Sequence, residues 1–178
     1  MKQINVEKLK IIEHPDPRLR RVCKPVQEFD GTLPRLAAKM LELMHQADGI
    51  GLAGPQVGVL ERIFVCNVTG DPKDDQVFVN PRLSDFIGHA EGNEGCLSLP
   101  EVSVAVRRSA GCKMEAVDVS GRPFTLTADG LLARCWQHEY DHLDGKMIID
   151  YMSEADKIAN RRVIKHLESK RKDRAPAF

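Results

Sequence analysis

The sequence feature that most constrains this chain is a pair of histidines, His138 and His142, in the run HEYDH at residues 138–142. On an α-helix, residues four apart share one face, so both imidazoles can reach one cation while Glu139 lies near its open coordination position. Leu131, Cys135 and His138 fall on one helical stripe, which predicts that the imidazoles face the interior. A surface helix with solvated His and Glu side chains is the alternative. Because a buried histidine needs a partner, we expect a metal site on this helix.

A catalytic metal of this type takes three protein ligands and a water molecule, so a third donor has to come from elsewhere. The third histidine of a metzincin would occupy position 148, which is Ile148. Two downstream carboxylates, Glu154 and Glu168, lie in no recognisable second motif. The best remaining donor is Cys96 in the run EGCLSLP, where Gly95 gives the backbone freedom to approach a ligand. The alternative for this cysteine is a thiol packed in the core.

The glycine-rich run GIGLAGPQVG at residues 49–58 contains a formal GxGxxG match. A dinucleotide-binding fingerprint follows a strand and opens a helix, whereas here an amphipathic helix precedes the run and Pro55 and Gly58 close it. We therefore expect a loop whose glycines let a substrate backbone come close and which presents the Gln56 amide as a hydrogen-bond donor. An ordinary glycine-rich connection is the alternative.

Length and charge limit the possible functions. The 178 residues predict one domain over residues 1–178, and equal numbers of Lys+Arg and Asp+Glu, 26 each, argue against a global basic field for DNA or membrane binding. No apolar run approaches the roughly 20 residues that cross a bilayer, and charges interrupt the N-terminal segment, so we expect a cytoplasmic protein with no membrane contact and no specific DNA binding. Five cysteines without a CxxC pair indicate reduced thiols.

Hydrophobic periodicity predicts helices at about residues 33–47, 131–143 and 153–172. Thr32 is the expected N-cap of the first helix, and Ile158, Val163 or Ile164, and Leu167 are the expected apolar stripe of the third. Alternating or β-branched runs predict strands at 62–68, 76–79, 102–107, 112–119 and 124–127. The middle of the chain is therefore expected to be mostly antiparallel sheet, with the proline-punctuated N-terminal stretch wrapping the domain surface.

Three segments together closely resemble the motifs of the peptide deformylases, in the same order: GIGLAGPQ at 49–56, EGCLS at 94–98 and QHEYDH at 137–142. The resemblance extends to residues 14–20 and 128–133 and so covers roughly residues 10–155. It implies an α+β fold with antiparallel sheets around a central metal-bearing helix. It also implies removal of the formyl group from N-formylmethionyl nascent chains by one divalent metal ion, typically Fe(II), with zinc, nickel or cobalt expected in some purified samples.

The resemblance also assigns site residues. It implies metal ligands at Cys96, His138 and His142, an acid/base at Glu139, oxyanion donors at Gln56 and the Leu97 amide, and a substrate cleft lined by Ile50, Gly51 and Gly95. The chain departs from the family pattern at Gly54, Tyr140 and Ser103, where an alanine, an aliphatic residue and, in some bacterial members, an arginine are usual. None of these three positions is an expected ligand.

The chemistry expected of such a centre is hydrolytic. A divalent ion held by one thiolate and two imidazoles lowers the pKa of its bound water from 15.7 towards about 7, so that hydroxide can attack the formyl carbonyl while Glu139 accepts the proton. A metallopeptidase or other amidase is the second interpretation, and a ribosome-associated binding protein that keeps the metal for stability is the third.

The C-terminal region from about residue 153 is basic. From residue 161 on, it carries seven cations against Glu168 and Asp173, namely Arg161, Arg162, Lys165, Lys170, Arg171, Lys172 and Arg174. A solvated helix end is the slightly preferred interpretation, and docking to the RNA-rich ribosome surface, where nascent substrate emerges, is the alternative.

Overall fold

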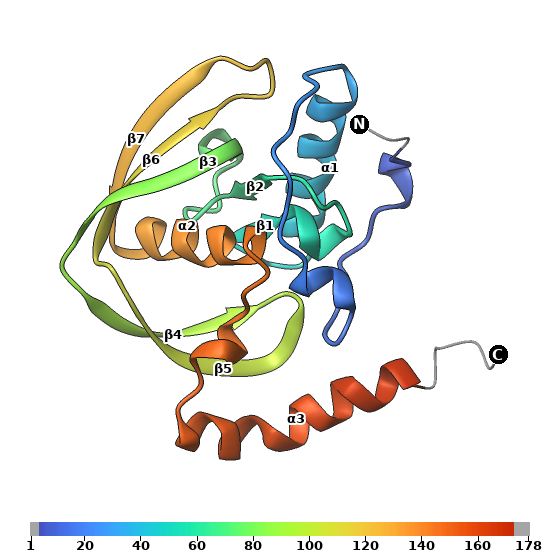
Figure 1. The fold of residues 1–178 in the computed structure, drawn as a ribbon, viewed down its shortest axis with the longest axis vertical. Helices are drawn as coiled ribbons and strands as arrows, with labels where there is room; N and C mark the ends of the chain where they lie inside the picture. Colours follow the sequence, from blue (N-terminus) through green and yellow to red (C-terminus); the bar gives the residue numbers. More distant parts are fainter. Residues whose placement is uncertain (1–3, 173–178) are drawn as a thin grey trace.

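The elements of this protein are arranged around one helix, as a computed structural model that describes residues 4–172 shows (Figure 1). The helices are α1 (Thr32–Gln46), α2 (Gly130–Leu143) and α3 (Glu154–Lys172). The strands are β1 (Gly51–Ala53), β2 (Ile63–Cys66), β3 (Gln76–Ile87), β4 (Ala90–Cys96), β5 (Leu99–Arg108), β6 (Gly111–Val117) and β7 (Pro123–Asp129). Short 3-10 turns connect several of them, among them Gly54–Val57.

Helix α2 lies between two antiparallel sheets. The larger sheet has the order β1-β2-β3-β6-β7, and the smaller one is the β4–β5 hairpin. Figure 1 shows α2 crossing the molecule with the large sheet above it and the hairpin below it. Trp136 anchors the helix on the large sheet, where its ring meets Phe78 edge-on at 5.4 Å and Phe78 stacks on Phe64 at 4.8 Å. The α+β fold with antiparallel sheets around this central helix is confirmed.

The three helices are confirmed to within a residue or two, but the predicted N-cap of the first is wrong. Thr32 is itself helical, and Gly31 occupies the cap position. The Asp30 carboxylate, one residue before Gly31, accepts a hydrogen bond from the Thr32 N–H at 2.9 Å and so supplies the capping interaction. Two strands, β1 and β4, were not predicted. Strand β1 has only three residues, too few to show an alternating pattern, and β4 consists largely of glycine and polar residues.

Helix α3 runs along the β4–β5 hairpin on the side away from α2 (Figure 1). Its apolar stripe packs into the cluster below the hairpin through Leu167, with Val163 and Ile164 partly buried beside it. Ile158 is not part of this stripe, since 77% of it is exposed. Asp173 and Arg174 lie outside the described residues, as do the side chains of Arg171 and Lys172. None of the helices in residues 4–172 combines the length and the hydropathy of a membrane-spanning segment.

The N-terminal stretch follows the surface in extended segments and short turns, as expected, and anchors itself with single apolar side chains. Val6, Ile12 and Leu19 are buried in two different clusters of the core. Among the cysteines, Cys96 alone is not buried, and all five are free thiols. The expectation of reduced, mostly buried cysteines is therefore confirmed.

Candidate active site

Helix α2 directs His138 and His142 into the interior between the two sheets. Their rings meet at 5.0 Å between centroids, and His142 is 1% exposed. The Nδ1 of His138 lies 2.9 Å from Oε2 of Glu94. An ionised carboxylate can only accept, so this Nδ1 carries the hydrogen and leaves Nε2 as the free electron-pair donor. Burial lowers the pKa of His142 well below its usual value, with His138 adding to the effect, so its imidazole is neutral, as a metal ligand must be.

Cys96 reaches the same point from the end of β4, just before the tight turn to β5. Its Sγ lies 3.3 Å from Nε2 of His142, and the ligand atoms of Cys96, His138 and His142 all lie within 4.8 Å of one another. Within residues 4–172, this trio is the only group of His, Cys or carboxylate ligands with such spacing. The two carboxylates considered from sequence lie elsewhere: Glu154 pairs with Lys157, and Glu168 is 3.7 Å from His14.

Sequence reasoning missed the residues that hold this trio in place. Glu94, whose side chain is 4% exposed, accepts two hydrogen bonds from Arg108 at 2.8 and 2.9 Å and one from Arg134 at 2.7 Å in addition to that of His138. Burial opposes the ionisation of Glu94, but the bonds from Arg108 and His138 outweigh it and lower its pKa to about 2. Arg108 also donates to Asp141 on α2 at 2.7 Å. The only sequence signal for this network was the place of Glu94 in the motif around Cys96.

Glu139 lies beside the trio in a space created by a glycine. A Cβ at Gly51 would stand 2.8 Å from the carboxyl carbon of Glu139 and 2.9 Å from Sγ of Cys135, so only glycine leaves room for the carboxyl group. Glu139 is 3% exposed, and its Oε2 has no hydrogen-bond partner among the described residues. Burial, with Cys66 nearby, raises its pKa well above the usual value. A carboxyl group with a raised pKa holds a proton more readily than an ordinary one, as a group that takes up and passes on a proton must.

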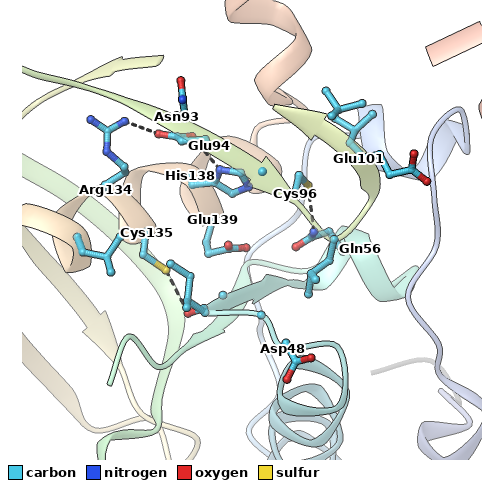
Figure 2. Close-up of a pocket in the computed structure, with 18 residues that line it drawn as sticks. Asp48, Gln56, Asn93, Glu94, Cys96, Glu101, Arg134, Cys135, His138 and Glu139 are labelled. Atoms are coloured by element: carbon cyan, nitrogen blue, oxygen red, sulfur yellow. Dashed lines mark hydrogen bonds and ion pairs between the residues drawn. The ribbon is translucent and has the colours of Figure 1, made fainter. Parts of the chain in front are cut away.

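The glycine-rich loop delivers an amide to the same place. Gln56 is 1% exposed, and its Oε1 accepts from the Ala53 N–H at 2.7 Å, which turns its Nε2 towards the trio. That nitrogen donates to Sγ of Cys96 at 3.5 Å and to Oγ of Ser98 at 3.3 Å. Figure 2 shows Gln56 beside Cys96, joined by the dashed line of this hydrogen bond, with Glu139 pointing into the pocket from the α2 side. The Gln56 amide therefore donates within this pocket, and its role towards a substrate stays a prediction.

A cavity of about 360 Å³ opens over these groups. Its lining includes every residue predicted for the site except His142, which lies below it. Leu99, Val102 and Leu131 add an apolar wall. The cavity therefore combines a polar floor with an apolar side, a combination suited to an apolar group of a ligand next to a polar one.

The donor set fits a divalent transition metal. One sulfur and two imidazole nitrogens suit Fe(II), Zn, Ni or Co better than Mg or Ca, which prefer oxygen ligands. Burial raises the pKa of the Cys96 thiol to about 12, so the thiolate needs a neighbouring positive charge to form. No fourth protein ligand joins the trio among the described residues, which leaves a coordination position for solvent, as in catalytic rather than structural sites.

Comparison with known proteins supports one family. The sequence model of that family, described as polypeptide deformylase, matches residues 8–158. A peptide deformylase of Hahella chejuensis is 46% identical over 171 residues, which are 96% of this chain and the whole of that protein. One of Alkalilimnicola ehrlichii is 45% identical over 160 residues, 89% of this chain and 90% of that protein.

Solved structures give the same result. A crystal structure of a peptide deformylase from Legionella pneumophila has a TM-score of 0.86 at 40% identity and covers 94% of this chain and 99% of that one. A plant peptide deformylase has a TM-score of 0.92 at 35% identity and covers 99% and 97%.

Proposed function

The chain belongs to the polypeptide deformylase family, whose members remove the N-terminal formyl group from nascent peptides, and we propose which of its residues carry out this hydrolysis. The observation that carries the proposal is the convergence of Cys96, His138 and His142 beside Glu139 in one cavity. A family of metal-dependent hydrolases requires this combination of a ligand trio and a buried carboxyl group.

Cys96, His138 and His142 would hold the metal ion, and we propose Fe(II) as the native one. When bound, the ion supplies Lewis acidity to a water molecule and to the formyl oxygen. Glu94 fixes the tautomer and orientation of His138 so that Nε2 points at the ion. The Cys96 thiolate makes such a centre sensitive to oxygen. Activity of the iron-loaded protein should therefore decay in air and persist with nickel or cobalt, whereas indifference to air would point to zinc.

Glu139 carries the proton in this proposal. In the reaction, the water oxygen bonds to the formyl carbon and the carbon–nitrogen bond breaks. One proton moves from water to the departing amine nitrogen, and the formic acid that leaves gives up its own proton to solvent as formate. Glu139 accepts this proton on its carboxyl group, where burial raises the pKa, and releases it to the amine. Such general acid–base catalysis contributes typically about 10² to 10⁴ in rate.

Gln56 and the Leu97 amide stabilise the negative charge that develops on the formyl oxygen. The Gln56 side chain is held from behind by the Ala53 N–H, so its Nε2 keeps its direction without rearrangement during the reaction. A donor fixed in this way is worth about 3 to 4 kcal/mol in the transition state. Ile50, Gly51 and Gly95 line the cavity and would approach the substrate backbone closely.

Replacing Glu139 by glutamine tests the assignment. Glu139→Gln keeps the shape of the side chain but cannot carry the proton, so we expect metal content near that of the wild type and a loss of formate release of about 10²-fold or more. Glu91→Gln, an exposed position on β4, is the matched control. Formate is measured with a formyl-Met peptide and metal by elemental analysis on the same anaerobic sample. Near-normal turnover of Glu139→Gln would exclude its role, and cleavage of unformylated peptides by the wild type would indicate a general metallopeptidase.

The location and partners of the enzyme are further proposals. Because formylated chains emerge from ribosomes, we propose that the protein acts in the cytoplasm. The cations Arg161, Arg162, Lys165 and Lys170 are exposed on α3 and suit an RNA surface, which supports docking to the ribosome. Binding that weakens with salt and is lost when these four residues become glutamine would support docking, whereas unchanged binding of that variant would exclude it.

A further inference from the structure

We propose that Asn160 of α3 is a positioning residue that holds one wall of the substrate cavity by pairing with the free edge of β5. The proposal rests on the function given above, because it concerns the cavity in which the formylated peptide would bind. It assigns to α3 a part in substrate binding that is separate from its cationic surface.

The first observation is that Asn160 pairs with the backbone of β5 as a neighbouring strand would. Its Oδ1 accepts from the Ser103 N–H at 3.2 Å, and its Nδ2 donates to the Ser103 carbonyl at 2.9 Å. The same Nδ2 donates to the Asp156 carbonyl one turn earlier in α3 at 2.9 Å. The carboxamide thus makes three hydrogen bonds and is 7% exposed. Asparagine in the middle of a helix lowers helix stability relative to alanine, so local preference does not explain its presence.

The second observation is that β5 needs such a partner. The hairpin sheet contains only β4 and β5 within the described residues, so one edge of β5 has no strand beside it. Unpaired edges leave backbone N–H and C=O groups without partners, which proteins cover with helices or loops. Asp156, one helical turn before Asn160, accepts from the Ala105 N–H, and this bond contributes to lowering its pKa after the larger effect of Ser153. Two successive turns of α3 therefore follow the same edge.

The third observation is what lies next to the paired residue. Val102 and Glu101 immediately precede Ser103, and both line the cavity over the metal trio. Glu101 has a φ of +63°, in the left-handed region that costs a non-glycine residue energy and persists only where the surroundings hold it. Figure 2 shows Glu101 on the wall of the pocket next to Cys96 and Gln56. Asn160, through Ser103, is the contact that holds this wall from outside.

These observations separate two effects. Cys96 precedes this segment and is oriented from the other side of the hairpin, where neighbouring Glu94 bonds to Arg108 and Arg134. Loss of the Asn160 pairing should therefore disturb the wall that meets the substrate more than the groups that react. We expect Asn160→Ala to raise KM roughly three- to tenfold, about the worth of one net hydrogen bond, and to leave kcat within about twofold and the metal content unchanged.

Two further variants distinguish positioning from general stability. Leu167→Ala removes a buried side chain of α3, 4% exposed, from the apolar cluster that also contains Val102, but it leaves both hydrogen bonds to Ser103 in place. It therefore serves as the control for a loosened helix. Asn160→Asp keeps the acceptor for the Ser103 N–H but loses the donor to its carbonyl, and it should give a smaller KM effect than Asn160→Ala. Hydrogen exchange of the amides of residues 101–103 supplies a readout that is independent of activity. It should speed up at least about tenfold in Asn160→Ala and remain near the wild-type rate in Leu167→Ala.

Raised KM and faster exchange in Asn160→Ala, with neither in Leu167→Ala at a comparable loss of Tm, support the proposal. An unchanged KM in Asn160→Ala, or an equal rise in both variants, overturns it. If the wild type releases no formate from a formyl-Met peptide, the proposed function has failed instead. In that case, unchanged exchange at residues 101–103 in Asn160→Ala would still overturn the positioning role, and faster exchange would support it.

Discussion

Replacing Glu94 by glutamine should damage both the stability of the fold and the metal site. In the wild type, this buried carboxylate accepts four hydrogen bonds, from Nε and Nη2 of Arg108, Nη1 of Arg134 and Nδ1 of His138. A glutamine of the same shape offers one acceptor oxygen and turns N–H donors towards other donors. Arg108, whose side chain is 6% exposed, would keep only Asp141 as a charged partner.

Breaking a buried ion pair by removing one partner costs about 3 to 5 kcal/mol. For a chain of this length, each kcal/mol corresponds to about 2 to 4 °C, so the Tm of the metal-free protein should fall by about 6 to 20 °C. Because Glu94 also orients His138, metal affinity should fall by about 10- to 100-fold. Denaturant unfolding of the metal-free protein measures the first effect, and competition with a chelator measures the second. The control is Glu91→Gln on the exposed face of the same strand.

The two measurements can refute different parts of the reasoning. A loss of stability below about 1 kcal/mol would mean that the buried network contributes no more than an exposed pair does. Unchanged metal affinity would mean that His138 is oriented by packing alone, and the role given to Glu94 would be wrong.

Three further changes test other parts of the structure. Gly51→Ala places a Cβ against the Glu139 carboxyl group and should lower kcat at least about 100-fold in a folded protein. The control is Gly31→Ala, which has nothing within 4 Å of the new Cβ and should keep the wild-type activity. Equal activities of the two variants would contradict the crowding at Gly51. Burial opposes ionisation of Asp150, but its ion pair with Arg20 outweighs it and lowers its pKa, so this pair stabilises the protein above the unfolded pKa and the effect is lost as pH falls. The difference in unfolding free energy between wild type and Asp150→Asn should therefore be largest at pH 6–7 and should shrink as the pH falls below about 4. A difference that does not change with pH would contradict this. Removing the metal with a chelator should lower the Tm by about 5 to 10 °C from a sample with metal at 100 times its Kd, and an unchanged Tm would speak against a bound ion.

The sequence was informative wherever the signal was local. The two histidines of α2 follow from helical periodicity alone, because residues four apart share a face whatever surrounds the helix. Gln56 could be predicted as a presented amide because the glycines around it suit a close approach of a substrate backbone, although the run forms strand β1 and a 3-10 turn rather than a plain loop. The structure places both as expected, and it brings Cys96 to the histidines from 42 residues upstream of His138.

The missed features depend on contacts between distant segments. Strand β4 contains Gly92, Asn93 and Gly95, residues that disfavour strands, and it forms because β5 pairs with it along most of its length. From its sequence, Arg108 would be expected at the exposed end of a strand. It is buried instead, because it forms ion pairs with both Glu94 and Asp141. The sequence of one segment gives no sign that it pairs with the other. Tertiary pairing, rather than local preference, determines these elements.

The position of Cys96 depends both on buried charge pairs and on backbone pairing. Cys96 is the last residue of β4, a strand whose own sequence specifies little, so its distance to His142 is set by the contacts that hold the hairpin. On the inner side, Glu94 ties the hairpin to α2 through buried charges, and on the outer side Asn160 pairs with the edge of β5. Buried charge pairs tolerate little displacement, because a small shift leaves a desolvated charge without a partner. The ligand geometry of this chain is therefore a property of three segments that lie far apart in sequence, and substitutions far from the motifs can alter it.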